Sequence, residues 1–299
     1  MRKEIDWSTI TIQNNFLFQD TFRNETLCNT FLNCVLHIPV KHIRYLETEK
    51  SVKVTLPGKG TRLDVYVEDE NGNAADIEMQ VVGKNSILYN DLEEEVVIRE
   101  LPLRARYYQC MIGANMLRSG AHYRDIKKAY VIFICVFDPF GKGLPVYHFT
   151  NRCKEKNDLQ MGDLTENIFL NTTAADKATD KELAAFLRYV NENVATNAFT
   201  KAVDKEATRI RNRDDWRLKI MTLDMEIDDM KRRIGKREHE KGKQEGLREG
   251  KQAGLREGKQ AGLSEGKREI AKKMLDDGMD IDKIVRFTEL SKEEVAALA

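Results

Sequence analysis

The chain has 299 residues, of which 41% are hydrophobic and 33% charged, and its 49 Lys and Arg balance 49 Asp and Glu. This length suits one core domain with appendages, and no apolar stretch approaches the roughly 18 residues that a membrane-spanning helix needs. The five cysteines are scattered and odd in number, which argues against a disulfide or zinc framework. The first ten residues, MRKEIDWSTI, form no apolar signal region, so a soluble, cytoplasmic protein is expected.

Charge is unevenly distributed along the balanced chain. Residues 1–100 carry 11 Lys and Arg against 17 Asp and Glu, a net of −6, whereas residues 201–273 carry 22 against 15, a net of +7. The acidic N-terminal part suits a metal-binding site. The basic C-terminal part suits either contact with a polyanion or a solvated charged helix.

Helical spacing of apolar residues predicts two helical stretches in the first 120 residues. The first runs from Ile12 to Leu36, and Asn24 followed by Glu25 is expected to cap a second helix inside it. The other covers residues 102–119 and ends before Gly120.

The predicted strands alternate with these helices. They cover residues 42–47, a hairpin over 51–83, and residues 129–138, 146–150 and 168–171. The run AYVIFICVFD at 129–138 is almost continuously apolar, which is typical of a central strand buried on both faces. This order indicates an α/β protein with a mixed central sheet flanked by helices.

The hairpin contains the most informative residues of the chain. A two-residue turn at Asn71-Gly72 would place Asp64 opposite Met79, so that Glu78 would point to the other face. A three-residue loop with Gly72 in the left-handed conformation instead pairs Asp64 with Glu78. The second register is favoured because it separates two kinds of side chain. It leaves one face apolar (Leu63, Val65, Val67, Ile77, Met79, Val81) and one polar (Asp64, Tyr66, Glu68, Asp76, Glu78, Gln80).

The C-terminal third differs from the core in pattern. A helical region is expected over 181–240. At 241–267 follows a repeat with glycine at every fourth position: GKQEGLRE, GKQAGLRE, GKQAGLSE. Because a mid-helix glycine costs up to about 1 kcal/mol relative to alanine, the repeat forms either a flexible, partly helical stalk or a self-associating helix.

The last segment, residues 268–299, is expected to form a small three-helix unit. Its first helix ends at Gly278, and Ser291 with Glu294 predicts a capping box for the third. Such a unit resembles a helix-turn-helix and suits either DNA contact or packing and oligomerisation. With a core over 1–180, four segments are therefore predicted.

Two carboxylates on adjacent strands, followed by a polar residue on the same face, suit metal-dependent phosphodiester cleavage. The pattern D-x13-ExQ, formed by Asp64, Glu78 and Gln80, resembles the motif of PD-(D/E)xK nucleases. Within that superfamily, the surroundings resemble the recombination-promoting nuclease and transposase family. These are NNFLFQDTF, LPLRARYYQCMIGANMLRSGAHYRDIKKAYVIFICVFDPFGKGLPVYHF and the glycine repeat, so the resemblance covers essentially the whole chain.

The resemblance implies a restriction-endonuclease-like core with a helical C-terminal extension. Asp64, Glu78 and the carbonyl of Met79 match metal ligands, for Mg²⁺ or Mn²⁺, and Gln80 occupies the place of the superfamily lysine. Arg104 and Tyr108 match a helical Arg-x-x-x-Tyr stretch, which suggests phosphate contact or structural support.

Two positions depart from the superfamily pattern. Gln80 carries no positive charge, and Asn15 stands where such nucleases often have an acid near the metal. The polar face that contains Asp76 also suits a merely solvated face of the sheet, with Asp76 itself peripheral.

The expected function is a metal-dependent DNA endonuclease of recombination or mobile elements. The alternative is a catalytically weak relative that binds DNA or protein and oligomerises through its tail. RNA remains a possible substrate, because metal–carboxylate chemistry does not itself read the 2′-hydroxyl.

Overall fold

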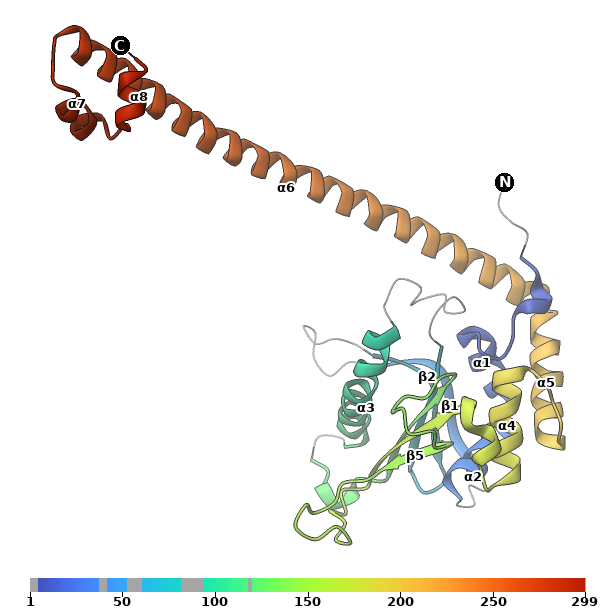
Figure 1. Ribbon diagram of the computed structural model, residues 1–299. Coiled ribbons are helices and arrows are strands. Elements are labelled where there is room, and N and C mark those ends of the chain that lie inside the picture. Colours follow the sequence, from blue (N-terminus) through green and yellow to red (C-terminus); the bar gives the residue numbers. More distant parts are fainter. Residues whose placement is uncertain (1–4, 38–41, 53–60, 82–93, 118–119, 299) are drawn as a thin grey trace. The chain divides into compact units, whose positions relative to one another are not determined.

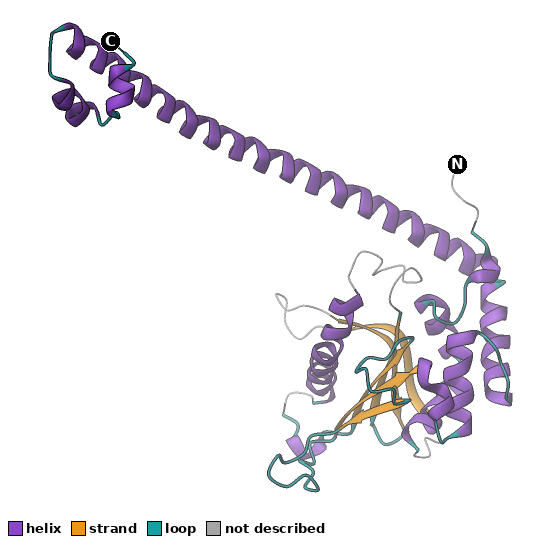
Figure 2. Cartoon of the chain, viewed as in Figure 1, coloured by secondary structure: helices purple, strands orange, loops and turns teal. Residues whose placement is uncertain are grey.

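The computed structural model describes residues 5–37, 42–52, 61–81, 94–117 and 120–298. The chain divides into two compact units, Met1–Leu218 and Lys219–Ala299, which are considered separately. Figure 1 labels many of their elements and Figure 2 colours all of them by type.

The first unit contains a six-stranded mixed sheet in the order β1-β2-β3-β4-β6-β5. Its strands are β1 (Ile43–Val52), β2 (Thr61–Asp69), β3 (Ala74–Gln80), β4 (Ala129–Cys135), β5 (Val146–Phe149) and β6 (Thr165–Asn171). Strand β4 pairs in parallel with β3 and with β6, while the β1–β2, β2–β3 and β5–β6 pairs are antiparallel. All seven β4 residues are buried, so the predicted central strand and the α/β mixed sheet are confirmed.

Helices cover both faces of this sheet. Helix α3 (Glu94–Met116) lies on one side; α1 (Asn15–Phe22), α2 (Glu25–Leu36), α4 (Lys181–Glu192) and α5 (Ala198–Arg211) lie on the other (Figures 1 and 2). Asn24 caps α2 as predicted, because its side chain accepts from the Leu27 N–H at 3.3 Å. Short 3₁₀ turns occur at Trp7–Thr9, Tyr123–Asp125 and Thr172–Lys177.

The predicted hairpin register is confirmed. Strands β2 and β3 pair Glu68 with Ala74 and Val65 with Ile77, which continues to Asp64 opposite Glu78. The connecting loop has Gly72 at φ +80°, the left-handed conformation that the three-residue loop requires. Asp69 closes the loop, since its carboxylate accepts from the backbone N–H of Asn71 and of Asn73, both at 2.8 Å.

Helix α3 begins eight residues before the predicted start. The prediction placed Pro102 at its first turn, where a missing N–H is harmless, but Pro102 lies inside Glu94–Met116. Burial offsets the local cost of proline, because Leu101, Ala105 and Ile112 pack into the core between α3 and the sheet. Only tertiary packing decided this boundary.

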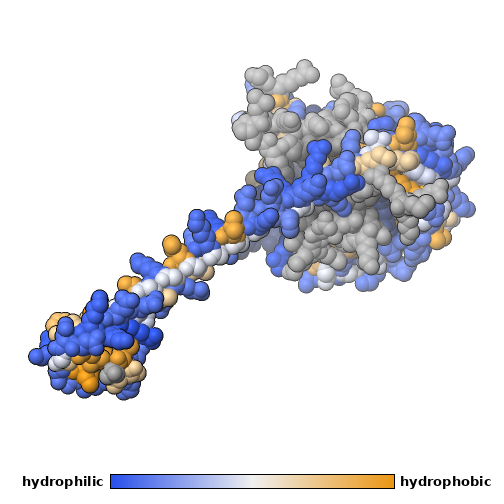
Figure 3. Space-filling model, turned by 90° about the horizontal axis from the view of Figure 1, so that it is seen from above, coloured by the Kyte–Doolittle hydropathy of each residue, from blue (hydrophilic) through white to orange (hydrophobic). Residues whose placement is uncertain are grey.

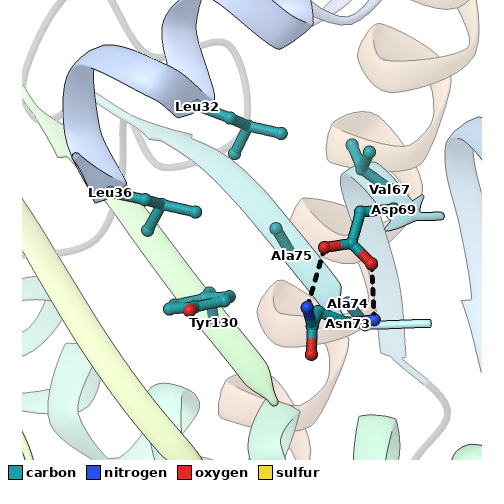
Figure 4. Close-up of a pocket in the computed structure, with 8 residues that line it drawn as sticks. All are labelled: Leu32, Leu36, Val67, Asp69, Asn73, Ala74, Ala75 and Tyr130. Atoms are coloured by element: carbon teal, nitrogen blue, oxygen red, sulfur yellow. Dashed lines mark hydrogen bonds between the residues drawn. The ribbon is translucent and has the colours of Figure 1, made fainter. Parts of the chain in front are cut away.

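The face of the sheet under α2 contains a small pocket of about 10 Å³, the size of one water molecule. Figure 4 shows Leu32 and Leu36 of α2 above Ala75 and Tyr130, with the Asp69–Asn73 hydrogen bonds at one side. The pocket is too small for an organic ligand, and it lies on the face opposite α3.

The second unit consists of helices. Helix α6 (Asp214–Asp276) begins in the first unit and continues through the whole glycine repeat, which is helical rather than partly helical. The face of α6 visible in Figure 3 is mainly hydrophilic with separate apolar side chains, and Leu247 and Leu255 are each 76% exposed. No helix in the described part of the chain is both long and apolar enough to cross a membrane.

The chain ends in a small three-helix core. The end of α6 packs with α7 (Ile281–Thr288) and α8 (Lys292–Ala296) around Ala271, Ile284, Leu290 and Val295. Ser291 and Glu294 form the predicted capping box, with reciprocal hydrogen bonds of 2.9 and 3.1 Å. Gly278, at φ +76°, ends the first of the three helices as predicted.

Candidate active site

Asp64 and Glu78 meet where the regular β2–β3 pairing ends. The backbone N–H of Asp64 donates to Glu78 Oε1 at 3.0 Å, and the N–H of Met79 donates to Asp64 Oδ2 at 3.2 Å. Each carboxylate thus accepts a hydrogen bond from a backbone N–H of the neighbouring strand, where regular β-pairing would supply a backbone carbonyl as the acceptor. This exchange fixes both carboxylates between the strands.

Burial makes this pair electrostatically costly. Asp64 is 9% and Glu78 2% exposed. Loss of hydration, and then the negative charge of Asp64, raise the pKa of Glu78 to about 8, although the nearby Arg104 opposes the shift. A proton or another cation is therefore favoured at Glu78 near neutral pH.

Asp76 belongs to the same acidic cluster. Its carboxyl is fully buried, and within the described structure neither oxygen has a hydrogen-bond partner. Burial, followed by the charges of Glu78 and Asp64, raises its pKa well above the usual value. The alternative of a solvated polar face is therefore wrong, because α3 covers this face and its acids are buried.

Gln19 brings helix α1 into the site. Its side-chain amide donates to Asp64 Oδ1 at 2.9 Å, and Gln19 is itself buried. Sequence reasoning considered Asn15, which is the first residue of α1, whereas Asn14 caps the helix through the N–H groups of Phe16 and Leu17. The missed signal is a polar residue one helical turn after Asn15 and next to the buried Phe18.

Arg104 of α3 joins the acidic pair to Gln80. One guanidinium nitrogen, Nη1, donates to Gln80 Oε1 at 2.7 Å, and the other, Nη2, donates to Glu78 Oε2 at 3.0 Å. Tyr108 lies one turn along the helix, and its hydroxyl accepts from Arg104 Nη2 at 2.9 Å. The structure therefore brings the predicted residues Asp64, Glu78, Gln80, Arg104 and Tyr108 into one cluster.

The backbone of Met79 faces this cluster. The carbonyl of Gln80 accepts from Val136 on the β4 side, so the N–H and C=O of Met79 point toward β2. The Met79 N–H bonds to Asp64 there, which places its carbonyl on the same edge as the two carboxylates.

The donor set fits a hard divalent cation. Carboxylate and carbonyl oxygens are the ligands that Mg²⁺ and Mn²⁺ prefer, and Mg²⁺ retains several waters beside one or two carboxylates. Across the described residues, no three His, Cys, Asp or Glu side chains are arranged around a metal position. A cation here would therefore depend on Asp64, Glu78 and the Met79 carbonyl, and the poorly compensated negative charge favours it.

Two family models match the chain, one over most of its length and one at its C-terminal end. Residues 13–191 match the model described as PD-(D/E)XK nuclease family transposase, and residues 264–299 match the Rpn/YhgA-like nuclease family, C-terminal HTH domain. No curated protein and no solved structure matches the chain. Because the first match covers more than half of the 299 residues and includes the whole acidic cluster, the chain belongs to the PD-(D/E)XK nuclease family of transposases.

Proposed function

We propose that the protein is a Mg²⁺- or Mn²⁺-dependent endonuclease that hydrolyses phosphodiester bonds of DNA. The observation that supports it most is the meeting of buried Asp64 and Glu78 where the β2–β3 pairing ends. The negative charge of two buried carboxylates is only partly compensated by their hydrogen bonds. Binding of a divalent cation would compensate it further.

Asp64, Glu78 and the Met79 carbonyl would hold the cation. Bound there, it would lower the pKa of a water molecule and neutralise charge that develops on the phosphate. The Gln19 amide and the Met79 N–H hold the two oxygens of Asp64, so that this side chain is oriented before substrate arrives.

Gln80 and Arg104 would act on the water and the phosphate. Gln80 has no charge, so its amide orients a water molecule by hydrogen bonding. The guanidinium of Arg104 provides the positive charge that Gln80 lacks, and with the Tyr108 hydroxyl it would contact a phosphate oxygen.

DNA is the proposed substrate and partner. The net charge of +7 over residues 201–273 favours contact with its phosphates, and the family description suggests recombination or mobile elements. All five cysteines are free, which suits a reducing compartment such as the cytoplasm.

Cleavage of a supercoiled plasmid tests this proposal. Nicking is expected with Mg²⁺ or Mn²⁺, none with EDTA, and a loss of at least about 100-fold in Asp64→Asn or Glu78→Gln. Both replacements keep the side-chain shape and remove the charge. Equal activity of the wild type and the two variants would refute the assigned site, and an RNA substrate of equal length checks the choice of nucleic acid.

A second candidate is a weakly catalytic relative that acts through self-association of its tail. Leu247, Leu255 and Leu263 of α6 are highly exposed, and they recur every eight residues beside the repeat glycines. The C-terminal unit supports protein contact over DNA contact: residues 264–299 carry 7 Lys and Arg against 9 Asp and Glu, and α8 has Glu293 and Glu294 in its first turn.

Light scattering of the full chain, together with the plasmid assay, tests whether the tail drives self-association. If the tail drives self-association, replacing the three leucines together by glutamine should lower the oligomeric mass and leave plasmid nicking unchanged. An unchanged mass would reject the tail interface. If the variant has a lower oligomeric mass and also fails to nick the plasmid, assembly is instead required for cleavage.

A further inference from the structure

Arg104 lies where a cation would be needed. Its guanidinium binds Gln80 and Glu78 together. Burial raises the pKa of both Glu78 and Asp76, and the positive charge of Arg104 opposes that rise. These two carboxyls and Asp64 form a buried acidic cluster at the end of the β2–β3 pairing. The guanidinium therefore compensates part of the charge that a divalent ion would compensate.

The contact between Arg104 and Glu78 occupies a carboxylate oxygen, Oε2, that a bound metal would also use. Glu78 Oε1 accepts from the Asp64 N–H, which leaves Oε2 as the oxygen turned toward α3, and Arg104 Nη2 binds it at 3.0 Å. A guanidinium and a divalent cation repel each other when they share one carboxylate in a sheltered site. Binding of one should weaken the hold of the other.

Arg104 is also able to leave this position. Its side chain is 22% exposed, whereas that of Glu78 is 3% exposed, so the guanidinium lies at the mouth of the cluster. It lies over the rings of Phe133 and Tyr108, at 5.4 and 5.5 Å from their centroids. These rings support the planar group without fixing its direction as a carboxylate does.

We propose that Arg104 is a built-in counter-ion of Glu78 that competes with the divalent cation and, once displaced, contacts a phosphate of the nucleic acid. This proposal rests on the proposed function, because it assumes a cation at Asp64 and Glu78. It assigns Arg104 two alternating partners, carboxylate and phosphate.

Calorimetric titration of the full chain with Mn²⁺, without nucleic acid, tests the competition. Arg104→Gln should bind Mn²⁺ about tenfold more tightly than the wild type, the factor that corresponds to loss of one charged hydrogen bond. Arg106→Gln is the matched control, because Arg106 is an exposed arginine of the same helix. Its Mn²⁺ affinity should equal that of the wild type.

A second measurement tests the phosphate partner. The salt dependence of duplex binding should be the same for wild type and Arg104→Gln in EDTA, because Glu78 then engages the arginine. With Ca²⁺, the slope of log affinity against log salt should be lower by about 0.9 in the variant, which is the contribution of one phosphate contact. An equal slope in Ca²⁺ would overturn the exchange of partners.

Arg104→Lys keeps the proposal testable if the glutamine variant fails to fold. A lysine keeps the charge but cannot bridge Gln80 and Glu78 together, so a smaller gain in Mn²⁺ affinity is expected. Unchanged or weaker Mn²⁺ binding in folded Arg104 variants would refute the competition while leaving the nuclease proposal intact. If neither the wild type nor any Arg104 variant binds Mn²⁺, both proposals fail.

Discussion

Asp64 and Glu78 are linked by an exchange of hydrogen bonds between their strands: the Asp64 N–H donates to Glu78 Oε1 at 3.0 Å, and the N–H that follows Glu78 donates to Asp64 Oδ2 at 3.2 Å. The carboxylates thus satisfy backbone donors that β-pairing no longer satisfies. Their positions are therefore set by two neighbouring strands rather than by flexible loops, which suits a preorganised site.

The raised pKa of Glu78 predicts a pH-dependent stability. Its value of about 8 in the folded protein exceeds the ordinary value of 4.5, so the native state holds a proton that the unfolded chain releases. The resulting stability is present below about pH 4.5 and is lost as the pH rises through 8. In EDTA, Glu78→Gln should therefore be more stable than the wild type at pH 8.5, by on the order of 2 kcal/mol.

Urea unfolding at pH 5 and pH 8.5 measures this difference. Glu68→Gln serves as a control on the same strand pair, since Glu68 is only partly buried. A gain for Glu78→Gln that is equal at both pH values would contradict the assignment of the shift to Glu78.

The carboxyl of Asp76, which has no hydrogen-bond partner among the described residues, should reduce stability as well. Asp76→Asn removes the charge, so its stability relative to the wild type should increase as the pH rises above about 4, reaching about 1–3 kcal/mol. Because the charge of Glu78 raises the pKa of Asp76, the variant that carries both replacements should gain less than the sum of the two. Thermal melting across pH 4–9 measures both effects, and strict additivity would show that the two carboxyls are independent.

Gln19 offers a way to add an acid beside Asp64. Gln19→Glu should destabilise the metal-free protein by about 1–2 kcal/mol, because a second carboxylate then meets Asp64 Oδ1 in a buried place. Mn²⁺ should raise its melting temperature more than that of the wild type. Gln19→Met, similar in shape and uncharged, should show no increased response to Mn²⁺; an increased response there would exclude a charge effect.

The loop of the hairpin depends on Gly72. Its φ of +80° disfavours any side chain, although a Cβ would meet Lys127 only at an ordinary 3.5 Å, so Gly72→Ala should cost about 1–2 kcal/mol through backbone strain. The matched replacement Gly113→Ala, in α3, should instead stabilise by about 0.5–1 kcal/mol, because no atom of the described residues lies within 4 Å of the added Cβ. Chemical unfolding of both variants tests the contrast; a neutral Gly72→Ala would exclude a role of the positive φ in stability.

Much of the core was predictable from local patterns. Alternation along β2 and β3, with the Asn71-Gly72 loop, was enough to pair Asp64 with Glu78, because this register separates the polar side chains of the two strands from the apolar ones. The apolar run of β4 likewise predicted a central strand. The start of α3 was not predictable, because proline normally marks the beginning of a helix and only burial overrides that rule.

The sequence alone determined the sheet type, the hairpin register and the identity of the two central carboxylates, since each depends on spacing within short segments. Tertiary structure decided what surrounds them. It buried Asp76, placed Gln19 beside Asp64, and brought Arg104 to Glu78 across 26 residues of chain. These contacts depend on how α1 and α3 pack on opposite sides of the sheet, and no local pattern encodes the angle at which a helix crosses a strand.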